Sequence, residues 1–201
     1  MSSELITIID LLRHGELEGD EDVFRGSTDD LLSDEGWQQM VTALDNKNDW
    51  DFIVTSPLQS CLEFADLIAK EEEIDLEINR DFKEIDFGAW EGFSPNEIFE
   101  EEPTILNQWW QSPTEVTPPD GEEYQVFKAR VLVALKKIIQ EHKGKKILLV
   151  THSGVIQTIL THLLGMNAEN LFRINVNYAS FSRIQMHHDS MGDSVCLIQH
   201  S

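Results

Sequence analysis

Two stretches of the chain are apolar at consecutive positions rather than at alternate ones. Residues 5–12 (LITIIDLL) and residues 146–151 (KILLVT) are rich in leucine, isoleucine and valine. Runs of this kind are typical of strands whose two faces are both covered by helices. We therefore expect both segments to be central strands of one sheet.

Shorter extended runs and helical periodicity fill the rest of the chain. Further strands are expected at residues 51–56, 76–82, 179–188 and 194–200. Helices are expected after Ser33, the candidate N-cap, and at residues 57–73, 95–111, 122–142 and 153–165, with Pro57 at a first helical position. This alternation predicts an α/β fold, a three-layer sandwich in which helices cover both faces of a mostly parallel central sheet.

One domain over residues 1–201 is expected from this length. Residues 84–121 are rich in tryptophan, proline and acidic residues, and they are interpreted as a cap-like insertion over the active face. Trp109 and Trp110 are interpreted as the core of this cap, with stacking on a substrate ring as the alternative.

Charge narrows the choice of partners. The chain has 15 Lys+Arg against 37 Asp+Glu, a formal net charge of −22, which disfavours nucleic acid and anionic membranes. No apolar run approaches the ~20 residues needed to cross a bilayer, and residues 1–10 lack the basic start of a signal peptide. The expected location is the cytoplasm, and an anionic substrate would need a locally positive pocket.

Both central runs end in a histidine. His14 follows Arg13 in LLRHGE, and His152 follows LLVT and opens a helix at SGVI. Ligands of open α/β sheets bind beyond the carboxyl ends of the strands, and helix N-termini favour anions. Arg13, His14 and His152 together are what phosphoryl transfer to an imidazole requires, because a neutral ring nitrogen attacks phosphorus while cations stabilise the equatorial oxygens.

Four segments, in order, resemble a known family. LLRHGE, SPL at residues 56–58, EIDFGAWEG at residues 84–92 and VTHSGVI are similar to the histidine phosphatase superfamily, in its phosphoglycerate mutase-like branch. The resemblance implies that His14 becomes a phosphohistidine, that Arg13 and His152 hold the phosphoryl group, and that Glu84 protonates the leaving oxygen. It implies no metal and no other cofactor.

Two positions depart from the family pattern. The second helix usually carries SPLxR, and here Ser60 stands in place of the arginine; an asparagine usual six residues after the nucleophile is replaced by Asp20. Arg25 in the loop is the candidate substitute for the missing cation. Losing one donor to the transition state costs on the order of 10²–10³ in rate.

Further candidate phosphate-binding residues accompany this set. They are Arg25, Gly26, Ser60, Glu122 and Ser153. Glu122 matches a Gly-Glu pair that the family places beside the phosphate, and it is an equally good acid for the first turn of its helix.

Two further segments bear on the substrate and on the class of protein. WWQSP…PPDGEE and THLLG…NYASFSRI look similar to alpha-ribazole phosphatases, which implies a small phosphomonoester, alpha-ribazole 5′-phosphate in cobalamin biosynthesis. The alternatives are a broad sugar-phosphate phosphatase or a phosphoglycerate mutase-like enzyme, and a weakened member that binds a phosphorylated ligand without turnover. The choice between a monomer and a homodimer stays open.

Overall fold

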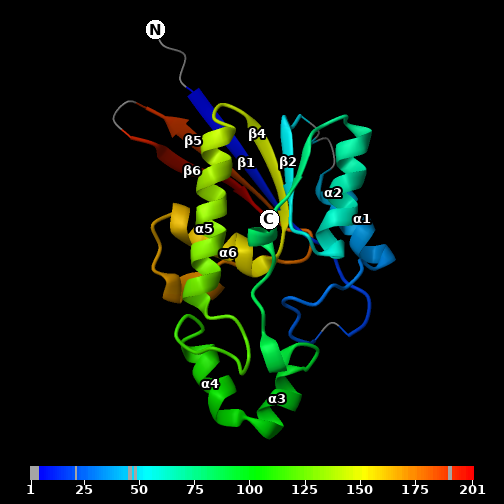
Figure 1. Ribbon diagram of the computed structural model, residues 1–201, viewed down its shortest axis with the longest axis vertical. Helices are drawn as coiled ribbons and strands as arrows, with labels where there is room; N and C mark the ends of the chain where they lie inside the picture. Colours follow the sequence, from blue (N-terminus) through cyan, green and yellow to red (C-terminus); the bar gives the residue numbers. More distant parts are fainter. Residues whose placement is uncertain (1–4, 21, 45–46, 48, 190–191) are drawn as a thin grey trace.

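A computed structural model describes residues 5–20, 22–44, 47, 49–189 and 192–201 and contains one six-stranded sheet within them (Figure 1). Its strands are β1 (Leu5–Arg13), β2 (Phe52–Thr55), β3 (Leu76–Ile78), β4 (Lys146–Thr151), β5 (Phe181–His188) and β6 (Ser194–His200). Their order is β3-β2-β4-β1-β5-β6. The first four in this order are mutually parallel, and β5 pairs antiparallel with both β1 and β6. The predicted mostly parallel sheet is confirmed.

Helices cover both faces of the sheet. α5 (Tyr124–Glu141) and α6 (Ser153–Leu163) lie on one face, and α1 (Asp34–Ala43) and α2 (Gln59–Glu71) lie on the other (Figure 1). Successive side chains of a strand point to opposite faces, so Ile147 and Leu149 pack with α5 and α6 while Leu148 and Val150 pack with α1 and α2. All four side chains are buried, which explains the uninterrupted apolar run in the sequence.

A third apolar cluster lies beyond the carboxyl ends of the parallel strands. It joins α3 (Pro95–Glu101) and α4 (Pro103–Gln111), at the lower end of Figure 1, to Phe24 of the loop that follows β1. Trp90 and Trp109 are buried in it; the Trp109 ring packs edge to face against both Phe24 and Trp90, and the Trp90 ring is tilted against Phe24. Phe24 therefore ties residues 84–121 to the loop that follows His14.

Several boundaries differ from those expected. Residues 95–111 form two helices, because Pro103 lacks an N–H and can only begin a new helix. α2 begins at Gln59, so Pro57 precedes it rather than occupying its first position. The expected strand 76–82 ends at Ile78 and continues as a 3₁₀ turn, η1 (Arg80–Phe82).

Two further 3₁₀ turns are η2 (Gly88–Trp90) and η3 (Ala168–Arg173), in segments where no helix or strand was expected. The N-cap at Ser33 is confirmed, since its hydroxyl accepts from the Gly36 N–H at 3.0 Å. Among the described residues, no helix combines the length and apolar character that crossing a bilayer demands.

Candidate active site

The two strand-end histidines are neighbours in space. β1 and β4 are paired so that Arg13 lies opposite Thr151, and the His14 N–H donates to the Thr151 carbonyl at 3.0 Å. His14 and His152 therefore leave the sheet at the same level. Their ring centroids are 5.2 Å apart, with the planes inclined at 61°. Both side chains are buried, which places two imidazoles at one shielded point.

His14 is held as a neutral ring with one free nitrogen. Its Nδ1 lies 2.8 Å from the Gly15 carbonyl oxygen, which can only accept, so Nδ1 carries the hydrogen and Nε2 presents its lone pair. Burial lowers the pKa of His14 to about 3, and the positive charge of Arg13 acts in the same direction. The ring is therefore unprotonated at neutral pH, with a lone pair on Nε2.

Arg13 is fixed beside this ring by two contacts. Its Nη1 donates to the Val176 carbonyl at 2.8 Å, and its guanidinium carbon lies 4.2 Å from the centre of the Tyr178 ring. Arg13 Nε is buried and has no hydrogen-bond partner among the described residues. A buried, unpaired donor next to the His14 ring suits an anionic oxygen of a ligand.

His152 is oriented by residues that the sequence did not single out. Its Nε2 lies 2.7 Å from Ser56 Oγ, and the buried Cys61 Sγ lies 3.7 Å from the same nitrogen. Burial, followed by the charges of His14 and Arg13, holds the pKa of His152 well below its ordinary value. Ser56 is the first residue of the SPL segment, which was the available signal for it, and Cys61 lies three residues beyond that segment in α2.

The Glu84 carboxyl group contacts the start of α6. Its Oε2 accepts from the Gly154 N–H at 2.7 Å, and its Oε1 accepts from the Ile85 N–H at 3.0 Å. Burial raises the pKa of Glu84, although these two N–H groups partly oppose the shift. A Cβ at position 154 would lie 2.5 Å from Oε1, so the close approach requires glycine there. Ser153 Oγ lies 3.4 Å from Oε2 and faces the same carboxyl group.

The loop after His14 contributes Arg25 and Gly26. Arg25 pairs with Asp30 at 3.1 Å and donates to the Asp20 carbonyl at 2.7 Å, and its charge also disfavours protonation of His14. The side chain of Asp20 itself is exposed. Gly26 packs against the Ile85 carbonyl, and a Cβ at Gly26 would collide with that oxygen. The loop is therefore pressed onto the segment that follows Glu84.

Glu91, the second glutamate of EIDFGAWEG, anchors this loop. Its carboxylate accepts from the backbone of Gly26 at 2.9 Å and of Ser27 at 2.7 Å, and from Thr28 Oγ1 at 2.7 Å. It also accepts from the Phe87 N–H at 3.0 Å. Four donors on one carboxylate give Glu91 a structural part in bringing Arg25 and Gly26 toward Glu84.

The remaining candidates lie at the edge of this group. Ser60 is buried in the first turn of α2, next to Cys61. Glu122 directs its carboxylate to Arg130, at 2.7 and 2.8 Å, rather than to the histidines. The phosphate-binding part suggested for Glu122 stays a prediction, and Arg130 is a partner that the sequence did not point to.

Comparisons with known proteins identify the family. The model of the histidine phosphatase superfamily (branch 1) matches residues 9–192. The chain belongs to this superfamily. The bifunctional protein Rv2228c of Mycobacterium tuberculosis is 32% identical over 183 residues, which cover 89% of this chain and 50% of that protein. The chain thus spans about half the length of the first curated relatives that it matches.

Two other similarities extend over nearly whole chains. The adenosylcobalamin/alpha-ribazole phosphatase of Escherichia coli is 25% identical over 179 residues, which cover 88% of each chain. The solved structure of Bacillus stearothermophilus YhfR superposes with a TM-score of 0.85 at 26% identity, over 96% of each chain. The phosphoglycerate mutase-like fold expected from the motifs is confirmed by these structural similarities.

Metal ligands are not grouped in this part of the molecule. Among the described residues, no cluster of three or more histidine, cysteine or acidic side chains could hold a metal ion.

The environment of His14 predicts an unusual titration. In an NMR titration of the ring nitrogens, we expect His14 to stay neutral with Nδ1 protonated down to pH 5, because its pKa is lowered to about 3. The Arg13→Gln variant should raise this pKa, since it removes the neighbouring charge while burial persists. A native-state His14 midpoint close to the ordinary value of about 6.5 would contradict the geometry.

Proposed function

We propose that this protein hydrolyses a small phosphomonoester through a phosphohistidine on His14. The observation that carries the proposal is the hydrogen bond from His14 Nδ1 to the Gly15 carbonyl at 2.8 Å. It fixes the neutral tautomer whose Nε2 lone pair can attack phosphorus. Membership of the histidine phosphatase superfamily supports the same reaction class.

The reaction then proceeds in two steps, phosphorylation of His14 and hydrolysis of the phosphohistidine. His14 Nε2 attacks phosphorus, the N–P bond forms, and the ester P–O bond breaks as protonated Glu84 gives its proton to the leaving oxygen. Water next attacks the phosphohistidine, Glu84 accepts the proton of that water, and the N–P bond breaks to release phosphate and neutral His14. The raised pKa of Glu84 suits both parts, because the group must be able to give and to take a proton near neutral pH.

Arg13 and His152 are placed to stabilise the transferred phosphoryl group. Arg13 offers its unpaired buried Nε, and the neutral His152 ring lies 5.2 Å from the His14 ring. The usual arginine of the second helix is absent at Ser60. We propose that Arg25 supplies part of the missing charge, since the loop holds it close enough to His14 to disfavour protonation of the ring.

The surroundings of Glu84 support a leaving alcohol that carries an aromatic ring. A cavity beside the carboxyl group is lined by Arg25 and by the aromatic residues Phe87, Trp109, Phe127 and Phe172, among others. Aromatic side chains pack well against a flat heterocyclic ring. We propose alpha-ribazole 5′-phosphate as the substrate, in keeping with the Escherichia coli relative named adenosylcobalamin/alpha-ribazole phosphatase. A broad sugar-phosphate phosphatase is the nearest alternative.

A second candidate function rests on Ser60. With a serine at this position, the site could bind a phosphorylated ligand without turning it over. The lone pair of His14 and the buried Glu84 carboxyl group favour turnover instead, because a binding site requires neither a free nucleophile nor a proton donor.

A panel of phosphomonoesters tests the proposed activity. We expect alpha-ribazole 5′-phosphate to be hydrolysed with a higher kcat/KM than glucose 6-phosphate, because its ring system fills the aromatic cavity. The His14→Ala variant should lose all turnover above background, and Glu84→Gln should lose on the order of 10²-fold or more on alkyl phosphates.

Two outcomes of the panel decide between the alternatives. Wild-type turnover equal to that of His14→Ala, together with tight binding of the esters, would leave only the binding function. A preference for sugar phosphates over alpha-ribazole phosphate would retain the phosphatase and reject the proposed substrate.

The missing arginine predicts a compensating pair of variants. Arg25→Ala should lower kcat/KM by about 10-fold or more, because a charged donor to the phosphoryl oxygens is lost. Adding Ser60→Arg should restore part of that rate. Ser60→Met is the matched control, since it introduces similar bulk without charge. Unchanged kinetics in Arg25→Ala, or equal effects of arginine and methionine at position 60, would argue against this part of the proposal.

A further inference from the structure

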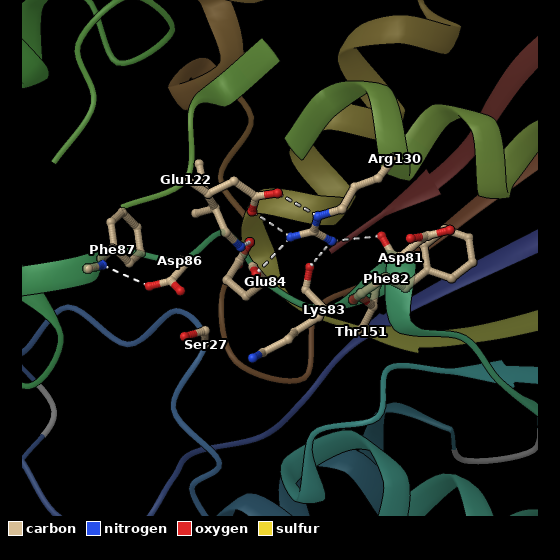
Figure 2. A network of polar contacts seen from close by, with 12 residues as sticks. Ser27, Asp81, Phe82, Lys83, Glu84, Asp86, Phe87, Glu122, Arg130 and Thr151 are labelled. Atoms are coloured by element: carbon tan, nitrogen blue, oxygen red, sulfur yellow. Dashed lines mark hydrogen bonds and ion pairs between the residues drawn. The ribbon is translucent and has the colours of Figure 1, made fainter. Parts of the chain in front are cut away.

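Arg130 uses its whole guanidinium group to join a carboxylate to three backbone carbonyls. Its Nε and Nη2 donate to the two carboxylate oxygens of Glu122 at 2.8 and 2.7 Å. Nη1 donates to the carbonyls of Asp81 and Lys83 at 2.9 and 2.7 Å, and Nη2 donates to the carbonyl of Glu84 at 3.0 Å. Figure 2 shows the guanidinium enclosed by these acceptors. All five N–H donors of the arginine are thus in use.

Two of the three carbonyls, those of Lys83 and Glu84, belong to a segment without regular secondary structure, and that of Asp81 belongs to the short 3₁₀ turn η1. Residues 83–87 follow η1 and precede η2, and Glu84 lies outside both turns. Within the described part of the chain, no donor other than Arg130 reaches the carbonyl oxygens of residues 81, 83 and 84. Arg130 itself is built into α5, whose buried face packs against the sheet. The guanidinium therefore attaches an irregular segment to a rigid helix.

Glu84 is held at both of its ends by this arrangement. Its backbone carbonyl is bound by Arg130 from α5, while its carboxyl group is bound by the Gly154 N–H at the start of α6. A guanidinium whose donors are all satisfied by the protein has none left for a phosphate oxygen. Arg130 is therefore placed to act through Glu84 rather than on the substrate.

We propose that Arg130, held in place by Glu122, is a positioning residue for the Glu84 proton donor. This inference rests on the proposed phosphatase function. The bidentate contact with Glu122 fixes the orientation of the guanidinium plane. The guanidinium then fixes the position of the backbone of residues 81–84 relative to α6. Without it, the Glu84 carboxyl group would remain near Gly154 but would no longer be aimed at the leaving oxygen.

The dependence on the leaving group tests this inference. An alkyl phosphate requires a proton on its departing oxygen, whereas p-nitrophenyl phosphate releases an oxygen that is stable as an anion. The Arg130→Met variant should lose about 10–100-fold in kcat/KM on the alkyl ester, a part of the 10²–10⁴ that a general acid supplies, and less than about threefold on the nitrophenyl ester. Arg130→Lys should resemble Arg130→Met, because lysine keeps the charge and loses the fork.

A double-mutant cycle separates positioning from general damage to the fold. In the Glu84→Gln background, Arg130→Met should cause almost no further loss on the alkyl ester, since the proton donor is already gone. Glu122→Gln is a milder variant, and it should cause a smaller loss with the same dependence on the leaving group. Arg183→Lys is the matched control, because Arg183 makes a comparable fork to Asp10, at 2.7 and 2.8 Å, on the antiparallel strand β5. Arg183→Lys should leave the ratio of kcat/KM on the alkyl ester to kcat/KM on the nitrophenyl ester unchanged.

The outcomes distinguish this inference from the function on which it rests. Equal losses on both esters, additive losses with Glu84→Gln, or full rescue by Arg130→Lys would overturn the positioning role while the phosphatase stands. If His14→Ala hydrolyses both esters as fast as the wild type, the proposed function and this inference fail together.

Discussion

The parallel pairing of β1 with β4 determines where every part of the site must lie. With Arg13 opposite Thr151, the two strands end at the same level, and the residue after each is a histidine. A shift of one residue in this register would turn one imidazole toward the other face of the sheet. The same pairing places the start of α6 directly behind His152, so that the Gly154 N–H meets the Glu84 carboxyl group at 2.7 Å.

Burial then decides the charge of each group in the site. The chain carries a formal net charge of −22, yet the buried histidines are neutral and burial favours the protonated form of Glu84. Arg13 and Arg25 supply positive charge beside His14. A dianionic phosphoryl group would thus meet a locally positive pocket inside a strongly acidic molecule. The separation of charge between surface and site is what makes an anionic substrate compatible with this composition.

The parts that the sequence predicted well depend on local patterns. Consecutive apolar residues identified β1 and β4, and the motifs that follow them pointed to His14 and His152. Glu84 could be found only through its motif, because one acid among 37 Asp+Glu carries no signal of its own. The helix expected at residues 95–111 is divided in two, because Pro103 begins a second helix.

Contacts between distant segments explain what the sequence could not supply. Arg130 lies 46 to 49 residues along the chain from the carbonyls that it binds, and the residues next to it in the sequence do not indicate these contacts. The sequence allows Glu122 to be a phosphate ligand or an acid of the first helical turn. In the structure α5 begins at Tyr124, so Glu122 precedes the first turn, and its carboxylate forms a fork with Arg130. The sequence does not indicate this contact, because the position of the 81–84 backbone beside α5 depends on the tertiary fold.

Trapping of the covalent intermediate is the most direct test of this account. In a rapid-quench experiment with a good phosphomonoester substrate, the wild-type chain should carry phosphate that is stable in base and labile in acid. Peptide mapping should locate it on His14, and the His14→Ala variant should carry none. Product formation at the full rate with no phosphorylated protein at any time, or phosphate on a different residue, would contradict the central claim.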